Sequence, residues 1–342
     1  MTMGRLRVVI YGLGQIGMDI ARLVLLQSHL DLVGAIDRDP AKVGAELSNL
    51  LDLPRGAGII VRDDAEEALS ELRPDVVVIA TTSVLRDVLV QARPAMAVGA
   101  SIVSTCEELV YPYTRYRDLA IEINNEAVAA GVGILGIGIN PGFVMDLLPV
   151  VLTAPCSDIR SIHVTRVINA SERRQAFVNR LGIGLDPAVV RKRVEEHRGP
   201  HTGLLESLGM IAGALGWQLD RITQRAEPII AEEWIRTPFV TIAPGQVMGF
   251  AQEVQGWIGR REVIELRWRA TIGERYTRDA LFIDGVPPID LVIRDGIHGD
   301  LATAALATRA IPAIAAARPG LHTVLDLPIL HYVAPPWRGG QY

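Results

Sequence analysis

Residues 12–17, Gly-Leu-Gly-Gln-Ile-Gly, constrain the fold of this 342-residue chain more than any other feature. The apolar run Val8–Ile10 precedes them, and apolar residues recur behind them at helical spacing, at Ile16, Ile20, Leu23 and Val24. Between a strand and a helix, the first glycine permits a tight turn, the second lets a pyrophosphate approach the backbone, and the third lets the helix pack closely. The helix N-terminus adds free amide donors for the phosphates.

This pattern predicts a dinucleotide-binding unit that holds a pyrophosphate through Gly12, Gly14, Gln15, Ile16 and Gly17. Twenty residues beyond the last glycine, a second apolar run ends in Asp37-Arg38. An acidic side chain at this place accepts the ribose hydroxyls of NAD, whereas a guanidinium pairs with the 2′-phosphate of NADP. Because both residues are present, NAD and NADP are both admissible. The alternative is an ordinary glycine turn in which Asp37 is only a cap.

Strand-like and helical patterns alternate along the N-terminal part of the chain. β-branched runs predict strands at residues 7–11, 32–36, 58–61, 76–80, 101–104 and 133–136. Helical periodicity predicts helices at residues 16–27, 64–72, 85–98 and 113–130. This alternation is typical of a parallel sheet covered on both faces. We therefore predict an α/β, doubly wound Rossmann domain over residues 1–145.

The pattern changes after residue 145. A strand over 158–167, a helical stretch over 187–215 interrupted at 199–203, and strand-and-turn patterns from 226 to 293 follow. They predict a second, α+β domain over residues 146–298, with a mainly antiparallel sheet and helices on one face. An Ala- and Leu-rich helix near 300–318 is expected to return to the first domain, and residues 319–342 are expected to form a C-terminal tail.

Composition excludes several classes of protein. The net charge of −5 gives no reason to expect nucleic acid as a partner. The stretch 301–317 is interrupted by Arg309 and Pro312, so no membrane span is expected. The first strand begins near residue 7, which leaves no room for a signal peptide. With two cysteines that form no disulfide framework, these features favour a cytoplasmic protein.

Lysine and histidine placement argues against other chemistries. The two lysines, Lys42 and Lys192, lie in no recognisable site, which disfavours Schiff-base catalysis and a phosphate-binding Gly-Lys-Ser/Thr loop. His197 and His201 are four residues apart, but the glycine and proline between them spoil the helical face that a metal site would need. We expect no metal site.

Two strand ends carry candidate chemistry, because parallel strands bind ligands at their carboxyl ends. The fourth predicted strand ends in Thr81-Thr82-Ser83, which are expected near the ribose and nicotinamide; helix capping is an alternative and compatible role. The fifth ends in Glu107-Glu108, and one of these carboxylates is predicted to face the nicotinamide and transfer protons. The alternative is that both lie in the first turn of a helix, favoured by its dipole.

Motifs spread over nearly the whole chain resemble the 2,4-diaminopentanoate dehydrogenase family, a branch of the dihydrodipicolinate-reductase-like proteins that includes native amine dehydrogenases. The resemblance rests on five segments in order: 11–17, Ser104–Pro112 with its Cys-Glu-Glu, 138–143 (Gly-Ile-Asn-Pro-Gly-Phe), 201–207 (His-Thr-Gly-Leu-Leu-Glu-Ser) and 295–303 (Asp-Gly-Ile-His-Gly-Asp-Leu-Ala-Thr). Their joint occurrence is far more specific than any one of them.

The resemblance implies NAD(P)-linked oxidative deamination of an amine, reversible as reductive amination of a ketone or aldehyde with ammonia. The family's catalytic glutamate maps onto Glu107-Glu108, and we favour Glu108. Asn140 is implied near the cofactor. The substrate pocket is implied to be lined by Ile139, Phe143, Met145, His201, Leu204 and Thr303, with Glu206 and Ser207 as further candidates. A homodimer formed through the open face of the second sheet is also implied.

The chain departs from true dihydrodipicolinate reductases, which carry a His-His pair and a lysine for a dicarboxylate. Both are missing here, so a simple amine or ketone suits the site unless Arg166, Arg173 and Arg174 bind a carboxylate. A diamino acid such as 2,4-diaminopentanoate is therefore an alternative substrate. Alcohol or sugar oxidation is disfavoured because no lysine follows Cys106-Glu107, and a non-catalytic NAD(P) sensor is the third hypothesis.

Overall fold

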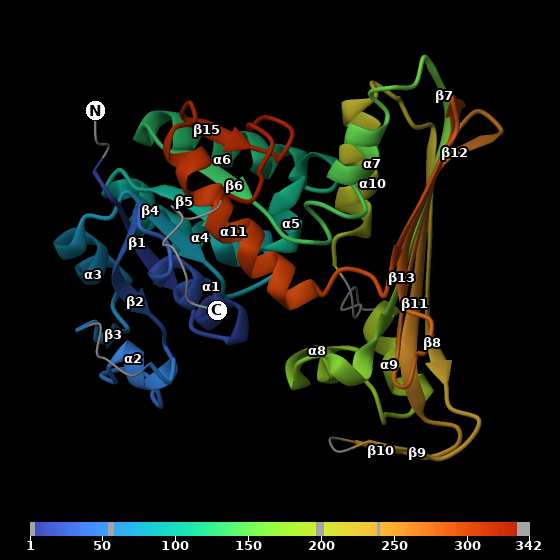
Figure 1. Cartoon of the computed structure of the whole chain (residues 1–342), viewed down its shortest axis with the longest axis horizontal. Coiled ribbons are helices and arrows are strands. Elements are labelled where there is room, and N and C mark those ends of the chain that lie inside the picture. Colours follow the sequence, from blue (N-terminus) through green and yellow to red (C-terminus); the bar gives the residue numbers. More distant parts are fainter. Residues whose placement is uncertain (1–3, 54–57, 196–201, 238–239, 334–342) are drawn as a thin grey trace, which may run out of the picture. The chain divides into compact units, whose positions relative to one another are not determined.

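The computed structural model describes residues 4–53, 58–195, 202–237 and 240–333. The chain forms two compact units, each with its own sheet (Figure 1). Unit 1 comprises residues 1–139 and 299–342, and unit 2 comprises residues 140–298. The chain thus leaves unit 1 after Ile139 and returns to it at Gly299.

Unit 1 is built on a seven-stranded parallel sheet in the order β15-β6-β5-β4-β1-β2-β3. Its strands are β1 (Leu6–Tyr11), β2 (Leu30–Ile36), β3 (Val61–Arg62), β4 (Val76–Ile79), β5 (Ser101–Ser104), β6 (Gly133–Gly136) and β15 (Gly320–His322). The central strands are continuous apolar runs, and all four residues of β4 are buried. Such runs suit a parallel sheet covered on both faces. The predicted α/β Rossmann class is confirmed for this unit.

Helices cover both faces of this sheet. They are α1 (Gln15–Leu25), α2 (Leu47–Leu50), α3 (Ala65–Leu72), α4 (Leu85–Ala97), α5 (Glu107–Val110), η1 (Pro112–Thr114), α6 (Arg117–Ala130) and α11 (Gly299–Ala315). Helices α1 and α11 pack together on one face, and α4 packs against both α3 and α6 on the other. A core of buried aliphatic side chains from α3, α4 and α6 lies against the strands.

The structure corrects three details of the expected elements in unit 1. The third strand lies at Val61–Arg62, not over 58–61. The helix expected from residue 113 to 130 is split into η1 and α6. The expected C-terminal tail also contributes β15, which pairs in parallel with β6. A three-residue strand of this kind has no periodicity of its own, so only its pairing reveals it.

Unit 2 contains a six-stranded sheet in the order β14-β13-β7-β12-β11-β8. Its strands are β7 (Asp158–Asn169), β8 (Arg221–Ile230), β11 (Val247–Ile258), β12 (Arg261–Thr271), β13 (Arg278–Val286) and β14 (Ile289–Arg294). Every neighbouring pair is antiparallel except β7 with β12. A separate ribbon joins β9 (Ile235–Arg236) to β10 (Thr241–Ile242). The expected mainly antiparallel second sheet is confirmed.

The helices of unit 2 lie on one side of this sheet in Figure 1. They are α7 (Leu147–Leu152), η2 (Ala170–Glu172), α8 (Gln175–Arg180), α9 (Pro187–Glu195) and α10 (Leu204–Ala214). Helix α10 packs on β11 and β12 and is buried along most of its length. Between α9 and α10, residues 196–201 are outside the described part of the chain, and they include the predicted pocket residue His201.

Two remaining features bear on the class of protein. In the described part of the chain, no helix is both long and apolar enough to cross a membrane. Cys106 and Cys156 are both free thiols, as the sequence indicates.

Candidate active site

The glycine motif forms a turn between β1 and α1 that leaves room for a phosphate group. Gly12 has a φ of +99°, a backbone conformation that strongly favours glycine. A Cβ at Gly17 would lie 1.8 Å from the carbonyl oxygen of Gly12, so the helix can approach the turn only with glycine there. At Gly14, by contrast, a Cβ would meet no atom within 4 Å.

The start of α1 is chemically suited to an anion. Its first turn carries no acidic side chain, and its first amides have no intrahelical acceptor. Ile16 is buried against the unit, whereas the side-chain amide of Gln15 contacts Asp19 at 3.1 Å. Open space beside Gly14, together with these free amides, fits the pyrophosphate of a dinucleotide.

Asp37 lies at the end of β2 and is tied to the glycine turn. Its Oδ2 accepts a hydrogen bond from the Leu13 amide at 2.7 Å, and its Oδ1 accepts one from the Asp39 amide at 2.9 Å. Lys42 also donates to Oδ2, at 3.1 Å. Partial burial acts to raise the pKa of Asp37, but the two amides and the Lys42 ammonium outweigh it and lower that pKa. The sequence places Lys42 in no recognisable motif, and the structure pairs its ammonium with Asp37.

Arg38 follows Asp37 directly in the chain. It is exposed, and within the described part of the chain its guanidinium makes no hydrogen bond or ion pair. A guanidinium without a carboxylate partner is available to bind a phosphate.

The hydroxyl residues after β4 have local partners. Thr82 Oγ1 accepts a hydrogen bond from the Val84 amide at 3.1 Å, and Thr81 Oγ1 donates to Gln91. The Ser83 carbonyl accepts the Glu108 amide at 3.4 Å. Thr82 therefore stabilises the turn that precedes α4. The loop also brings the ends of β4 and β5 together.

Glu108 is a buried carboxylate at the carboxyl edge of the sheet, 8% exposed. Its Oε2 accepts a hydrogen bond from the Leu85 amide at 2.8 Å, and its Oε1 accepts one from the Tyr116 hydroxyl at 3.0 Å. The Arg115 guanidinium lies 4.0 Å from Oε1. The backbone bond caps α4, whose own N-cap residue, Val84, provides no side-chain cap. The carboxylate is thus fixed in position, and each oxygen keeps a lone pair.

Tyr116 is a site residue that the sequence interpretation missed. It precedes α6, and its pKa is raised by burial and by its hydrogen bond to the Glu108 carboxylate. The raised pKa keeps the phenol protonated, so that it remains a donor to Glu108. A tyrosine eight residues after a candidate carboxylate has no recognisable motif, and only the fold shows their contact.

Glu107 and Cys106 differ from Glu108 in their surroundings. Glu107 begins α5 and is half-buried. Cys106 is fully buried, and burial raises the pKa of its thiol far above the usual range. Because the thiolate is the nucleophilic form, Cys106 is unsuited to covalent catalysis. Glu107 and Glu108 remain the candidate proton carriers of this segment.

Ile139 and Thr303, two predicted pocket residues, meet within unit 1. The Thr303 hydroxyl, in the second turn of α11, accepts a hydrogen bond from the Ile139 amide at 3.3 Å. Ile139 is the last residue of the unit before the chain enters unit 2. The contact therefore fixes the point at which the chain leaves the Rossmann sheet.

In unit 2, Asp146 organises the Asn-Pro-Gly-Phe segment that begins the unit. It is fully buried, and its carboxylate accepts hydrogen bonds from the Gly142 amide, the Leu147 amide and the Ser207 hydroxyl, each at 2.7 Å. Burial raises the pKa of Asp146, against the opposing effect of these three donors. Asp146 was not among the predicted site residues, although Ser207 was.

The Asn-Pro-Gly-Phe segment is also held by a close contact between Pro141 and the backbone of Gly203. Gly203 has a φ of +118°, and a Cβ there would lie 2.2 Å from Cδ of Pro141. Of the other predicted residues here, Asn140, Met145 and Leu204 are buried and Phe143 is half-buried. The motifs at 138–143 and 201–207 are thus brought into contact within one unit, because only glycine at 203 permits it.

A buried ion pair anchors the other end of unit 2. Arg166 Nη1 lies 2.8 Å from Asp279 Oδ2, and both side chains are almost fully buried. Arg166 Nη2 donates to the Ile297 carbonyl at 2.6 Å, and the Ile297 amide donates to Asp279 at 2.8 Å. Burial lowers the pKa of Arg166 and raises that of Asp279, against their mutual attraction. Arg166 is engaged inside unit 2, which makes it a poor candidate for a substrate carboxylate clamp.

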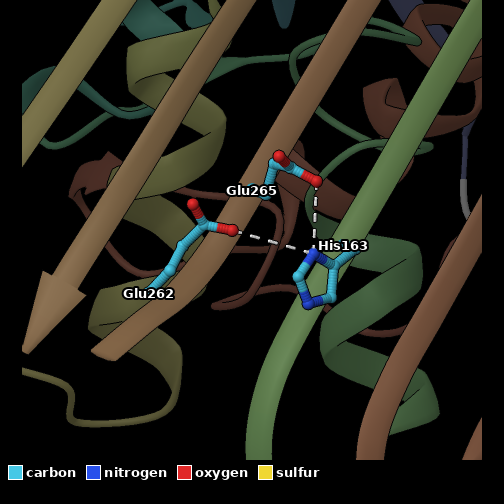
Figure 2. A group of neighbouring side chains, drawn as sticks. All are labelled: His163, Glu262 and Glu265. Carbon is cyan, nitrogen blue, oxygen red and sulfur yellow. Dashed lines mark hydrogen bonds and ion pairs between the residues drawn. The ribbon is translucent and has the colours of Figure 1, made fainter. Parts of the chain in front are cut away.

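A second polar group lies on the sheet of unit 2, outside all of the predicted site residues (Figure 2). His163 Nδ1 lies 3.3 Å from a Glu265 oxygen and 3.9 Å from a Glu262 oxygen. These side chains have the donor types and spacing that a metal ion requires. The hydrogen bond between His163 and Glu265 also explains their proximity. His163 lies about a hundred residues before the two glutamates in sequence, so no local motif indicates the group.

Comparison with known proteins shows relatives that span the full architecture. The family model for the 2,4-diaminopentanoate dehydrogenase C-terminal domain matches residues 143–338, and that for the dihydrodipicolinate reductase N-terminus matches residues 6–105. The chain is 34% identical over 334 residues to 2,4-diaminopentanoate dehydrogenase of Acetoanaerobium sticklandii, covering 96% of this chain and 94% of the relative. It is 25% identical to an amine dehydrogenase of Streptomyces virginiae, covering 94% and 96%.

A solved structure has the same fold throughout. The amine dehydrogenase from Mycobacterium smegmatis superposes with a TM-score of 0.88 at 28% identity, covering 96% of this chain and 97% of that one. The structure of GenD2 from gentamicin A biosynthesis shares the fold at a TM-score of 0.56 and 17% identity, covering 95% and 91%. Sequence, family models and fold agree, and the chain belongs to the 2,4-diaminopentanoate dehydrogenase family.

Proposed function

We propose that the chain is an NAD(P)-dependent amine dehydrogenase, which deaminates an amine oxidatively and, in reverse, aminates a ketone or aldehyde with ammonia. The observation that carries this proposal is Glu108, a buried carboxylate fixed at the carboxyl edge of the cofactor-binding sheet. Family membership supports the reaction, since curated relatives are named 2,4-diaminopentanoate dehydrogenase and amine dehydrogenase.

The phosphate cradle and the carboxylate provide different parts of the reaction. Gly12, Gly14 and Gly17, with the first amides of α1, would hold the pyrophosphate. When bound, the nicotinamide accepts or donates the hydride. Glu108 would accept hydrogen bonds from ammonia or the amine, stabilise the positive charge of the iminium, and exchange protons with the substrate nitrogen.

Glu108 is suited to this role because its position does not depend on the substrate. Tyr116 and the Leu85 amide each donate to a different oxygen of its carboxylate. A carboxylate held in this way is ready to stabilise a developing cation without reorganisation. Tyr116 is a positioning residue in this scheme, and Glu107 is the alternative proton carrier because it lies beside Glu108.

Substitution at Glu108 tests the proposal. In E108Q the amide oxygen can still accept the Leu85 amide, so α4 keeps its cap while the negative charge is removed. We expect E108Q to keep the wild-type melting temperature and NADPH affinity and to lose turnover by at least about a hundredfold. E107Q is the matched control and should keep most activity. Near-normal turnover of E108Q would contradict the assignment, and loss only in E107Q would transfer the role to Glu107.

For the cofactor, we propose that both NAD and NADP are accepted. Asp37 at the end of β2 and the exposed Arg38 beside it support this dual recognition. Binding titrations with NADH and NADPH, followed by nucleotide fluorescence, measure both affinities directly. A difference greater than about a thousandfold would show that one of the two is excluded.

For the substrate, we propose a simple amine or its ketone, with a diamino acid as the alternative. The internal engagement of Arg166 supports the first choice, because it leaves only Arg173 and Arg174 of the three candidate arginines. Phe143, Leu204, Ile139 and Thr303 remain proposed pocket residues. NADPH consumption at high ammonia with a panel of ketones, aldehydes and 2-amino-4-oxo acids tests this choice. Reduction that does not require ammonia would redirect the assignment to alcohol chemistry.

We also propose that the protein is a homodimer that pairs through the helix-free face of the unit 2 sheet. Exposed apolar residues on β13 and β14, such as Phe282 and Val292, support this face. Light scattering after size exclusion distinguishes a dimer from a monomer, and a charged substitution, F282E, should shift the mass to that of a monomer.

A further inference from the structure

The loop after β2 is a compact turn built from its own side chains. Asp39 Oδ1 accepts a hydrogen bond from the Ala41 amide at 3.0 Å, and the Lys42 amide donates to the Asp39 carbonyl at 2.8 Å. The turn directs the Lys42 ammonium back to Asp37, at 3.1 Å, and to Asp39, at 3.4 Å. Because these contacts are local, residues 37–42 are sufficient to place Lys42 beside Asp37.

Asp37 therefore has little capacity left to bind a ribose. An ionised carboxylate offers about four lone-pair sites. Oδ2 accepts from the Leu13 amide and from Lys42, and Oδ1 accepts from the Asp39 amide. Accepting both hydroxyls of an adenosine ribose would require Lys42 to move away. NAD thus loses part of the recognition that an unpaired aspartate would give it.

The charges of the same loop favour a phosphate. An unpaired Asp37 would repel a 2′-phosphate, which carries between about one and a half and two negative charges at neutral pH. Here Lys42 pairs with both Asp37 and Asp39, and with the exposed Arg38 the formal charges of these four side chains sum to zero. Removing the lysine would leave the loop with a net negative charge where the 2′-phosphate must bind.

We propose that Lys42 is the residue that determines cofactor preference: it occupies and neutralises Asp37, and with Arg38 it binds the 2′-phosphate, so that the protein prefers NADP to NAD. This inference rests on the proposed function, since it presupposes a dinucleotide on the glycine turn. It goes further by assigning the preference to a residue outside the glycine motif and the Asp37-Arg38 pair.

The test is the ratio of two dissociation constants, measured without turnover. NADPH and NADH are titrated into wild type, K42M and K42R, and binding is followed by nucleotide fluorescence or calorimetry. Lys192, the other lysine, is exposed on α9 in unit 2, so K192M is the matched control. Removing one charge-assisted hydrogen bond weakens binding by about tenfold or more.

We expect K42M to weaken NADPH binding by about tenfold while NADH binding stays equal or becomes tighter. K42R should keep the wild-type preference, and K192M should change neither constant. Unchanged ratios in K42M, with its melting temperature intact, would overturn the inference while leaving the proposed function untouched. If wild type bound neither nucleotide, the proposed function itself would fail. If K42M does not fold, K42Q, which keeps a donor but removes the charge, takes its place, and an unchanged NADPH/NADH ratio in K42Q would overturn the inference.

Discussion

Replacing Arg166 by methionine should destabilise unit 2 strongly. The guanidinium is buried between β7 and β13, where it pairs with Asp279 and donates to the Ile297 carbonyl. Methionine fills a similar volume but provides no charge and no donor. The change leaves the buried Asp279 carboxylate with a hydrogen bond from the Ile297 amide but without a countercharge, and it removes the donor to the Ile297 carbonyl.

The magnitude follows from the burial of both partners. Removing one partner of a buried ion pair costs about 3–5 kcal/mol, because the remaining charge is left uncompensated. For a domain of this size, each kcal/mol lowers the melting temperature by about 2–4 °C. We therefore expect R166M to melt at least about 6 °C below wild type. The double variant R166M/D279L should recover most of this loss, since it removes both charges together.

The assay is thermal unfolding followed by circular dichroism, with urea titration for the free energy of unfolding. Burial raises the folded-state pKa of Asp279, and loss of Arg166 removes a charge that opposes this rise. A raised folded-state pKa contributes stability that is fully present below the unfolded-state pKa and is lost as the pH rises through the folded-state pKa. The deficit of R166M should therefore be large near pH 7 and should shrink as the pH falls toward 4. A melting temperature within 2 °C of wild type at neutral pH would refute the reasoning.

Three further predictions concern the segments that hold the candidate site. D146N should destabilise unit 2 by about 2 kcal/mol in urea titration. The three donors bind both carboxylate oxygens of Asp146, and an asparagine has only one oxygen that can accept. Equal stability would show that these hydrogen bonds carry no net energy. G203A should lower the melting temperature by several degrees, because the backbone of Gly203 is left-handed and a Cβ there would clash with Pro141. An unchanged melting temperature would mean that the segments around Pro141 and Gly203 separate easily. The carboxyl pKa of Asp37, followed by carbon NMR, should lie below 3.8 and should rise in K42M. Stability contributed by its hydrogen bonds is present above the unfolded-state pKa and is lost as the pH falls through the lowered folded-state value, so a pKa insensitive to K42M would contradict the ion pair.

At each of the two points where the chain passes from one unit to the other, a buried aspartate accepts a hydrogen bond from a backbone amide. At the first crossing, the buried carboxylate of Asp146 binds the Gly142 amide just inside unit 2. At the second, the buried carboxylate of Asp279 binds the Ile297 amide just before the chain leaves it. In both places a buried acid satisfies backbone amides that would otherwise be costly to bury. This gives the sequence motifs at 138–143 and 295–303 a structural role in unit 2, beside any role in catalysis.

Local sequence was sufficient for the parts of the molecule whose physics is local. The spacing of Gly12, Gly14 and Gly17 predicts a turn and a helix start, because each glycine avoids a steric clash or leaves open space within a few residues. Apolar β-branched runs predicted the parallel strands, and strand-and-turn patterns predicted most of the second sheet. The class of cofactor and the position of Glu107-Glu108 at a strand end follow from the same periodicity.

Tertiary structure decided what depends on contacts between distant residues. The carboxylate of Glu108 has its orientation set by Leu85 and Tyr116, and Arg166 is taken out of the candidate substrate site by Asp279, more than a hundred residues away. Strand β15 exists only because β6 offers it an edge. Periodicity records which face of an element is buried, whereas the partner of a buried polar group is chosen by packing. The glycine turn could therefore be predicted from the sequence, but the partners of the Glu108 carboxylate could not.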